Sequence, residues 1–182
     1  MDANKLDKVA IVAVDGAARL GRINEVLFET EPLRVAALKA AADDGEFMVP
    51  IDRIRKFGPD AVMVDSPDVR QLMHVGEANM HSLTELKKLK VVDEDGRFLG
   101  TVNTVDFDPD TGRVERLNAG TGGVLGMGGS TATISARGVR SVGSELLTVA
   151  ASSHESESAP ESESAAEPES RPRSESRPRS EE

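Results

Sequence analysis

The chain of 182 residues contains no cysteine, no tryptophan, no tyrosine and only five phenylalanines. Without cysteine it has no disulfide, no thiolate metal ligand and no cysteine nucleophile. So few aromatic rings provide little surface on which nucleic-acid bases stack. The formal net charge is −10, which disfavours a phosphate backbone as a partner. We therefore do not expect direct binding to nucleic acid.

Long apolar segments are also missing. The longest uninterrupted apolar run covers residues 9–14, far short of the roughly 20 residues that a membrane-spanning helix needs. Residues 1–8 are largely polar, and no apolar signal region follows them. We expect a soluble protein of the cytoplasm that does not insert into a membrane.

The C-terminal part differs in composition from the rest. The 31 residues from Ser152 onward include ten serines, nine glutamates, four arginines and four prolines, and they carry half of the net charge. The hexapeptide Glu-Ser-Arg-Pro-Arg-Ser occurs there twice, at 169–174 and 175–180. Such a segment buries too little apolar surface to fold, so we predict that residues 151–182 are a disordered tail. We favour a solubilising role over that of an interaction segment charged further by serine phosphorylation.

An internal duplication organises the remainder. A shift of 79 aligns residues 20–24 (Leu-Gly-Arg-Ile-Asn) with residues 99–103 (Leu-Gly-Thr-Val-Asn). Further along, a shift of 85 aligns residues 54–64 with residues 139–149. A six-residue insertion in the glycine-rich stretch of the second copy accounts for the change, so the chain contains one structural unit twice.

Each copy has the pattern of short β-strands. Residues 99–107 alternate between polar and apolar, with Val102 and Val105 on opposite faces or separated by a bulge. Asp-Gly pairs at 15–16 and 95–96 predict tight turns, as does Asp-Pro-Asp-Thr-Gly at 108–112. Units of about 60 residues bury little surface alone, so we expect the copies to pack together or to dimerise.

The segment between the copies contains helix signals. Ser66 and Pro67 suit the N-cap and the first helical position, and we predict a short helix over residues 67–75. Residues 82–85 (Ser-Leu-Thr-Glu) predict a capping box. The predicted organisation has four parts: a first barrel-like domain at 1–65, a linker with a short helix at 66–82, a second domain at 83–150 and the tail at 151–182.

Several segments resemble one known family. Residues 83–86 (Leu-Thr-Glu-Leu) and 91–102 (Val-Val-Asp-Glu-Asp-Gly-Arg-Phe-Leu-Gly-Thr-Val) resemble the opening of a PRC-barrel domain. Residues 135–143 resemble its closing segment, and residues 49–58 of the first copy match that segment better. The resemblance implies an all-β fold with two tandem small β-barrels.

The family includes the cytoplasmic domain of the photosynthetic reaction-centre H subunit, the C-terminal domain of the ribosome-maturation factor RimM and short stand-alone proteins. The resemblance carries no catalytic signature and implies a non-enzymatic adaptor or scaffold that binds an unidentified protein partner. Two alternatives stay open: an accessory role in ribosome or RNA maturation, and one in electron or proton transfer at a reaction centre. We assign no catalytic, cofactor-binding or metal-binding residue, and a homo-oligomer also stays open.

Two motifs resemble ligand sites, but for each we favour a purely structural role. In the glycine-rich stretch 120–131, Gly123 and Gly128 have the spacing of a phosphate-binding loop, but Gly129 stands where the lysine is required. We predict a flexible or hairpin loop. Residues 106, 108 and 110 are aspartates that alternate as in a calcium loop but lack its glycine and glutamate, so we predict a plain β-turn.

A third candidate is a possible metal-binding triplet. His74, Glu77 and His81 are spaced by three and four residues, as on one helix face. Gly76 interrupts the helical pattern and no fourth ligand follows, so we predict a solvated linker.

Arginines recur at equivalent positions of the two copies. They are Arg34 and Arg113, and Arg55 and Arg140. They could bind an acidic partner, but we expect exposed strand residues or ion pairs with Asp60 and Glu145. Such surface pairs stabilise by only about 0–1 kcal/mol.

Overall fold

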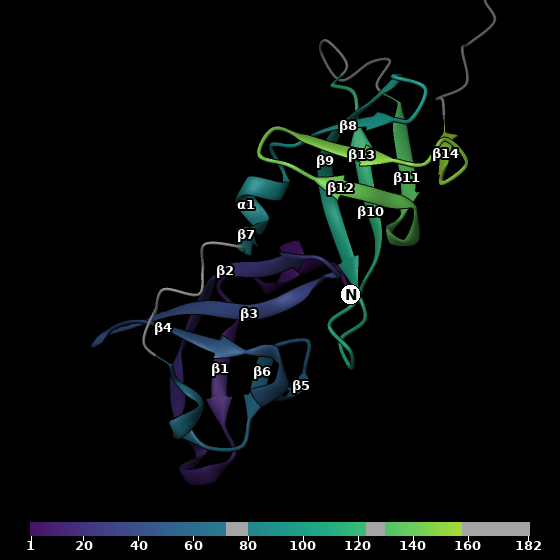
Figure 1. Cartoon of the computed structure of the whole chain (residues 1–182). Helices are drawn as coiled ribbons and strands as arrows, with labels where there is room; N and C mark the ends of the chain where they lie inside the picture. The colour runs from purple at the N-terminus through teal and green to yellow at the C-terminus, as the bar shows by residue number, and fades with distance from the viewer. Residues whose placement is uncertain (72–79, 123–129, 158–182) are drawn as a thin grey trace, which may run out of the picture.

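The computed structural model describes residues 1–71, 80–122 and 130–157. Within these residues the protein consists of β-strands, one short α-helix and several 3-10 turns, arranged in two units that pack against each other (Figure 1). The predicted all-β fold with two tandem units is confirmed. Residues 158–182 of the predicted tail lie outside the described residues.

The first unit forms one sheet with the strand order β4-β3-β2-β1-β6-β5. Strands β1 and β6 run parallel, and the other neighbours are antiparallel. The strands are β1 (Ala10–Ala13), β2 (Arg19–Thr30), β3 (Leu33–Ala42), β4 (Gly45–Pro50), β5 (Ile54–Phe57) and β6 (Ala61–Val64).

The second unit repeats this topology as β11-β10-β9-β8-β13-β12, again with one parallel pair, β8 and β13. A seventh strand, β14, pairs with the edge strand β11. The strands are β8 (Lys90–Asp93), β9 (Phe98–Phe107), β10 (Val114–Gly120), β11 (Thr131–Ser135), β12 (Val139–Val142), β13 (Leu146–Val149) and β14 (His154–Glu157). The start of the predicted disordered tail is therefore part of the sheet, because its backbone satisfies an otherwise open edge.

A bulge occurs at the same place in the long strand of each unit. In β9, Asn118 is opposite Thr104 and Ala119 is opposite Val102, so Asn103 is the extra residue. The register of β2 shifts at the equivalent position, Asn24. The bulge turns both Val102 and Val105 into the core, where they are almost fully buried. Of the two arrangements that the sequence allowed, opposite faces or a bulge between the two valines, the bulge is confirmed.

The predicted tight turns are confirmed. Gly16, Gly96 and Gly112 have φ angles of 70°, 80° and 70°, a region that glycine enters without steric cost. The short element after β4 is a 3-10 turn at Ile51–Arg53, and its counterpart lies at Ala136–Gly138.

The linker differs from its prediction. Ser66 caps only a 3-10 turn at Pro67–Val69, and Arg70 is already extended. The backbone of Gln71 then exchanges two hydrogen bonds of 2.9 Å with Met48 on β4. The predicted helix over 67–75 is therefore wrong up to residue 71, because pairing with the open sheet edge satisfies the backbone instead. Residues 72–75 lie outside the described part.

After the linker the chain forms β7 (Met80–Ser82) and α1 (Leu83–Leu86). The predicted capping box is confirmed: Ser82 accepts a hydrogen bond from the Glu85 amide, and Glu85 accepts one from the Ser82 amide. Strand β7 pairs with the C-terminal half of β2 in the first unit, with Ser82 opposite Leu27. The second unit therefore extends an arm onto the first.

The first unit extends an equivalent arm onto the second. Its N-terminal 3-10 turn η1 (Ala3–Leu6) corresponds to α1, and Asp2 caps it as Ser82 caps α1. The Phe107 amide at the end of β9 donates to the carbonyl of Met1 at 2.8 Å. Figure 1 shows the N-terminus beside the tip of β9 and the α1 arm between the two sheets.

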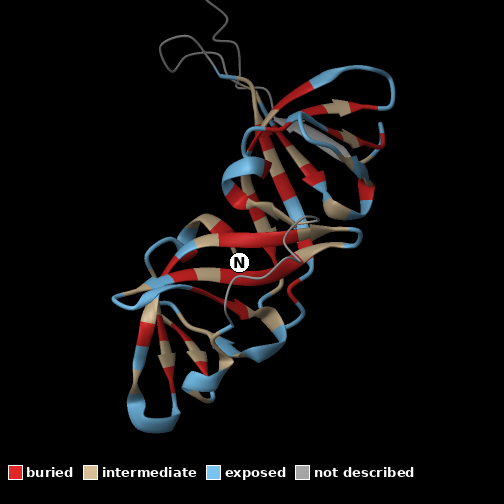
Figure 2. Cartoon of the chain, turned by 60° about the vertical axis from the view of Figure 1, so that its left-hand side comes forward, coloured by how far each residue is buried: buried red, intermediate tan, exposed pale blue. Residues whose placement is uncertain are grey.

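The exchanged arms give the two units an approximate twofold relation. Arg34 and Arg113, which are equivalent residues, form a backbone bridge with each other. The Phe57 and Phe107 rings from different units meet edge to face with centroids 5.4 Å apart. Buried side chains of both units belong to one hydrophobic core, and buried positions follow the strands of both sheets (Figure 2). The expected packing of the two copies is confirmed within one chain.

Candidate interaction surfaces

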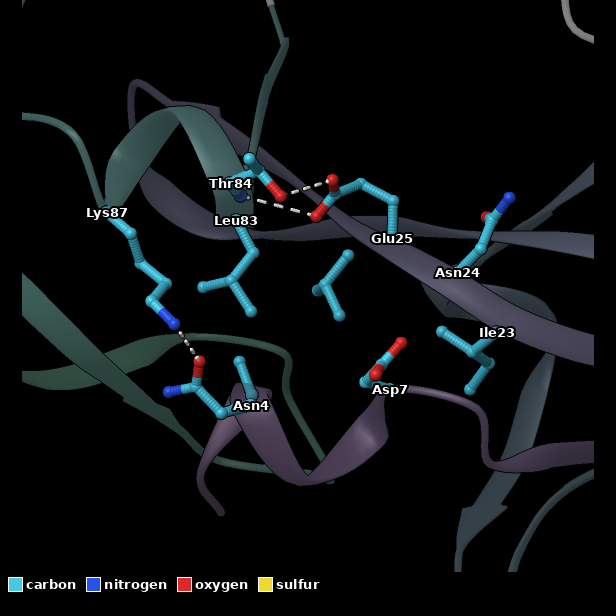
Figure 3. A pocket seen from close by; sticks show the side chains of 10 residues that line it. Asn4, Asp7, Ile23, Asn24, Glu25, Leu83, Thr84 and Lys87 are labelled. Carbon is cyan, nitrogen blue, oxygen red and sulfur yellow. Dashed lines mark hydrogen bonds between the residues drawn. The ribbon is translucent and has the colours of Figure 1, made fainter.

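A cavity of about 320 Å³ lies where the two arms meet. Four of its polar side chains form two hydrogen-bonded pairs (Figure 3). The Thr84 hydroxyl donates to the Glu25 carboxylate at 2.8 Å, and the Lys87 ammonium donates to the Asn4 side-chain oxygen at 2.9 Å. These bonds link α1 to β2 and η1, so we interpret the cavity as part of the joint between the units.

A second feature is the solvent-facing side of β2, β1, β6 and β5. In one cross-strand row, Val12 lies between Arg19 and Met63, and Met63 lies opposite Lys56. In the next row, Ala10 lies between Arg22 and Ala61. Residues paired across strands point to the same side of a sheet. The buried residues between them, such as Ile11 and Val62, point into the core. We call these seven residues and Val14, which follows β1, the first outer face.

The equivalent surface of the second unit lies on β9, β8, β13 and β12. Val92 lies between Phe98 and Thr148, and Thr148 lies opposite Ser141. The neighbouring row contains three residues, Thr101, Lys90 and Leu146. We call these seven residues the second outer face.

Exposed apolar side chains concentrate on the two outer faces. Among the described residues, the large hydrophobic side chains with the greatest exposure are Phe98 at 50%, Val14 at 49% and Leu146 at 47%. Each lies on one of the faces. Single exposed apolar residues are ordinary, but these three lie on equivalent surfaces of the two repeats, which makes the two outer faces the candidate interaction surfaces.

An ion pair closes one end of each outer face. Arg55 donates to Asp65 at 3.0 Å, and the equivalent Arg140 donates to Glu94 at 2.9 Å. The two acids follow different members of the parallel pair: Asp65 follows β6, whereas Glu94 follows β8, which is the equivalent of β1. The equivalent arginines are therefore ion-paired in both domains, but the acidic partner follows a different strand in each domain.

These pairs correct a prediction. Asp60 and Glu145 were expected as partners of the arginines, but both lie at the opposite end of their hairpins. Antiparallel pairing aligns Ile54 with Val64, which places Arg55 beside the end of β6 rather than beside the turn that contains Asp60. A third recurrent arginine, Arg34, pairs with Glu29 at 2.8 Å. This hydrogen bond raises the pKa of the Arg34 guanidinium above its ordinary value.

The predicted β-turn at residues 108–112 is confirmed. The Asp108 carboxylate accepts hydrogen bonds from the amides of Asp110 at 2.8 Å and Thr111 at 3.4 Å. These bonds hold the pKa of Asp108 below its ordinary value. Asp106 lies within β9, and the three aspartates do not come together as a metal-binding group.

The remaining candidates fall mostly outside the described residues. His74 and Glu77 lie there, as do Gly123, Gly128 and Gly129. His81 lies in β7, where its backbone pairs with Phe28. In the part of the chain that the structure describes, no group of three or more metal-binding side chains comes together, and no helix is long and apolar enough to cross a membrane.

Sequence reasoning did not identify the outer faces. The signal was present as apolar residues at outward positions of the strands, Val12 and Met63 in the first copy and Val92 and Phe98 in the second. It becomes visible only when the parallel pairing of β1 with β6 and of β8 with β13 is known, because these strands are far apart in sequence.

Comparison with known proteins agrees with the topology. The PRC-barrel domain matches the chain twice, over residues 1–71 and 78–153. No curated protein matches. The two matches cover most of the chain and coincide with its two structural units. The chain belongs to the PRC-barrel domain family and carries two such domains in tandem.

Proposed function

We propose that this protein is a non-catalytic adaptor or scaffold that binds protein partners through its two outer faces. The observation that carries the proposal is the confinement of Val14, Phe98 and Leu146, three strongly exposed apolar side chains, to equivalent surfaces of the two domains. Contact with a partner removes such side chains from water, which stabilises a complex by about 25 cal/mol per Å² of apolar surface.

The joint between the domains supports this role. The exchanged arms and the common core hold the two outer faces on one framework. Two binding surfaces on one framework raise the local concentration of the second contact after the first has formed. A partner with two binding segments, or two partners at once, would therefore be held together.

The proposal is tested with the full chain as bait. Val14→Asp and Phe98→Asp place a charge on the first and second outer faces, respectively. Ser135→Asp is the matched control, since Ser135 is exposed, lies outside both faces and is opposite Arg116. Circular dichroism checks that each variant is folded.

We expect partners captured by the wild type to be lost with the double variant Val14→Asp/Phe98→Asp and to be kept with Ser135→Asp. Retention of every partner by the double variant would refute binding through the faces. Turnover of a small molecule by the purified protein would refute the non-catalytic role.

A further inference from the structure

Charge distinguishes the first outer face from the second. In the two cross-strand rows of the first face, Arg19 and Arg22 lie on β2 and Lys56 lies on β5, and no acidic residue occurs between them. Arg22 donates to the backbone of Lys8 at 3.1 Å while it stays exposed. Acidic residues outnumber basic ones in the chain by 32 to 22, so two rows with basic edges and no acidic residue are a local departure. The acid at the end of this face, Asp65, is paired with Arg55 at 3.0 Å.

The basic edges enclose an apolar centre. Ala10, Val12, Ala61 and Met63 lie between them, all half-buried. Two alanines leave the centre shallow, and the flexible Met63 side chain adapts to different shapes. Both properties suit a surface that receives the apolar stripe of a partner.

The spacing of the edges matches a helix. Strand β2 is separated from β5 by β1 and β6, and three strand spacings amount to about 14 Å. An α-helix with its side chains is about 10–12 Å wide. A helix that lies along the strands would therefore place its apolar stripe on the alanines, Val12 and Met63, with side chains of both flanks reaching the basic edges.

From this geometry we infer that the first outer face binds an amphipathic helical segment of a protein partner with acidic residues on both flanks of its apolar stripe. The inference rests on the proposed function and adds the class of partner and the domain that binds it. A lipid surface is a weaker match, because each basic residue contributes only about 1 kcal/mol near anionic lipid and the chain as a whole is strongly acidic.

The second outer face lacks the basic edges. Phe98 stands at the position equivalent to Arg19, Thr101 at that of Arg22 and Ser141 at that of Lys56. Its one basic residue, Lys90, lies in the centre between Thr101 and Leu146. The acidic helix should therefore select the first face.

The duplication supplies a matched set of variants. Arg19→Phe/Lys56→Ser gives the first face the residues that the second copy has at the same places. Phe98→Arg/Ser141→Lys makes the opposite change on the second face. Each replacement is a residue that the same fold already contains at the equivalent position, so the risk of unfolding is low. Arg137→Glu, at an exposed site outside both faces, is the control for net charge.

The probe is a synthetic amphipathic peptide of about 18 residues, or five helical turns, with leucines along one stripe and glutamates on both flanks. A second peptide carries lysine in place of every glutamate. Each is added to the full-length protein, and amide chemical shifts are followed by NMR at low and high salt.

With the glutamate peptide we expect saturable shifts at Ala10, Val12, Ala61 and Met63, and binding that weakens as salt rises. Arg19→Phe/Lys56→Ser should weaken binding about tenfold, since two charge pairs are lost. Arg137→Glu should change it less than twofold. Phe98→Arg/Ser141→Lys should add a second set of shifts around Val92.

Equal binding of the lysine peptide, or shifts centred on the second face in the wild type, would overturn the inference. Binding of vesicles of phosphatidylserine and phosphatidylcholine through the first face would assign it to a membrane instead. Concentration-dependent shifts at the first face without peptide would assign it to a second copy of the chain. If the peptide fails but partners are still lost with Val14→Asp/Phe98→Asp, only this inference fails. If no partner depends on those residues, the proposed function fails.

Discussion

The α1 arm provides a direct test of whether the two domains form one cooperative unit. Leu86 lies on α1, which precedes the strands of the second domain, yet α1 packs on β2 of the first domain. Its side chain is fully buried in the common core. Leu86→Ala should therefore destabilise both domains together.

The expected cost follows from the burial. The substitution removes three carbon atoms, at about 0.8 kcal/mol each for lost transfer free energy, and leaves a cavity that adds to this. We expect the free energy of unfolding to fall by about 3–4 kcal/mol. That is a large part of the 5–15 kcal/mol typical of folded proteins. Leu6→Ala, at the equivalent buried position of the other arm, should cost about the same.

The assay must avoid intrinsic tryptophan and tyrosine fluorescence, because the chain has neither residue. Urea unfolding is followed by circular dichroism, and hydrogen exchange with mass spectrometry reports on peptides of each domain separately. Lys88→Ala is the control, since Lys88 is exposed and is the second residue after α1. We expect one transition, shifted to lower urea in Leu86→Ala, with equal loss of protection in β3 and β10.

Two separate transitions would refute the reasoning, in particular if β3 of the first domain kept its protection while the second domain unfolded early. That result would mean that the exchanged arms are peripheral contacts and that each sheet is stable alone.

Three further predictions concern local features. Gly100→Ala should lower the free energy of unfolding by about 2–4 kcal/mol in urea titrations, because φ is 132° and a Cβ would lie 2.6 Å from the backbone of Gly120; an unchanged midpoint would contradict this. The hydrogen bond from the Ser82 amide holds the pKa of Glu85 below its ordinary value of about 4.3, so the stabilisation by ionised Glu85 is complete above that pH and is lost as the pH falls through the lowered pKa. Glu85→Gln should therefore flatten the fall in thermal stability below about pH 4, and an unaltered pH profile would contradict the assignment. Arg140→Ala should cost no more than about 1 kcal/mol, because its ion pair with Glu94 is exposed, and a larger loss in the same titrations would show a further role.

Much of the fold could be predicted because the signals are local. The shifts of 79 and 85 residues match the equivalence of β2 with β9 and of β6 with β13. The glycine turns, the capping box at Ser82 and the bulge in β9 are set by residues that lie close together in the chain. Alternation, turn residues and capping residues act over a few positions, so one sequence is sufficient to detect them.

The failed predictions all involve distant pairing. The linker helix after Pro67 gave way to a bridge between Gln71 and Met48. Arg55 found Asp65 rather than Asp60. An open strand edge decided the conformation of the linker, and the strand register decided the partner of Arg55, and neither is a local feature of the sequence.

The sequence by itself determined that the protein is a duplicated all-β chain of the PRC-barrel type, because turn chemistry and strand alternation are written in short segments. Only the tertiary structure decided that each domain extends an arm across the other, and that Val12 meets Met63 and Val92 meets Thr148 on matching outer faces. The physical reason is that the parallel pairs join residues 51 positions apart in the first domain, as Ala10 with Ala61, and 56 apart in the second, as Lys90 with Leu146. The surface it creates therefore has no local signature in the sequence.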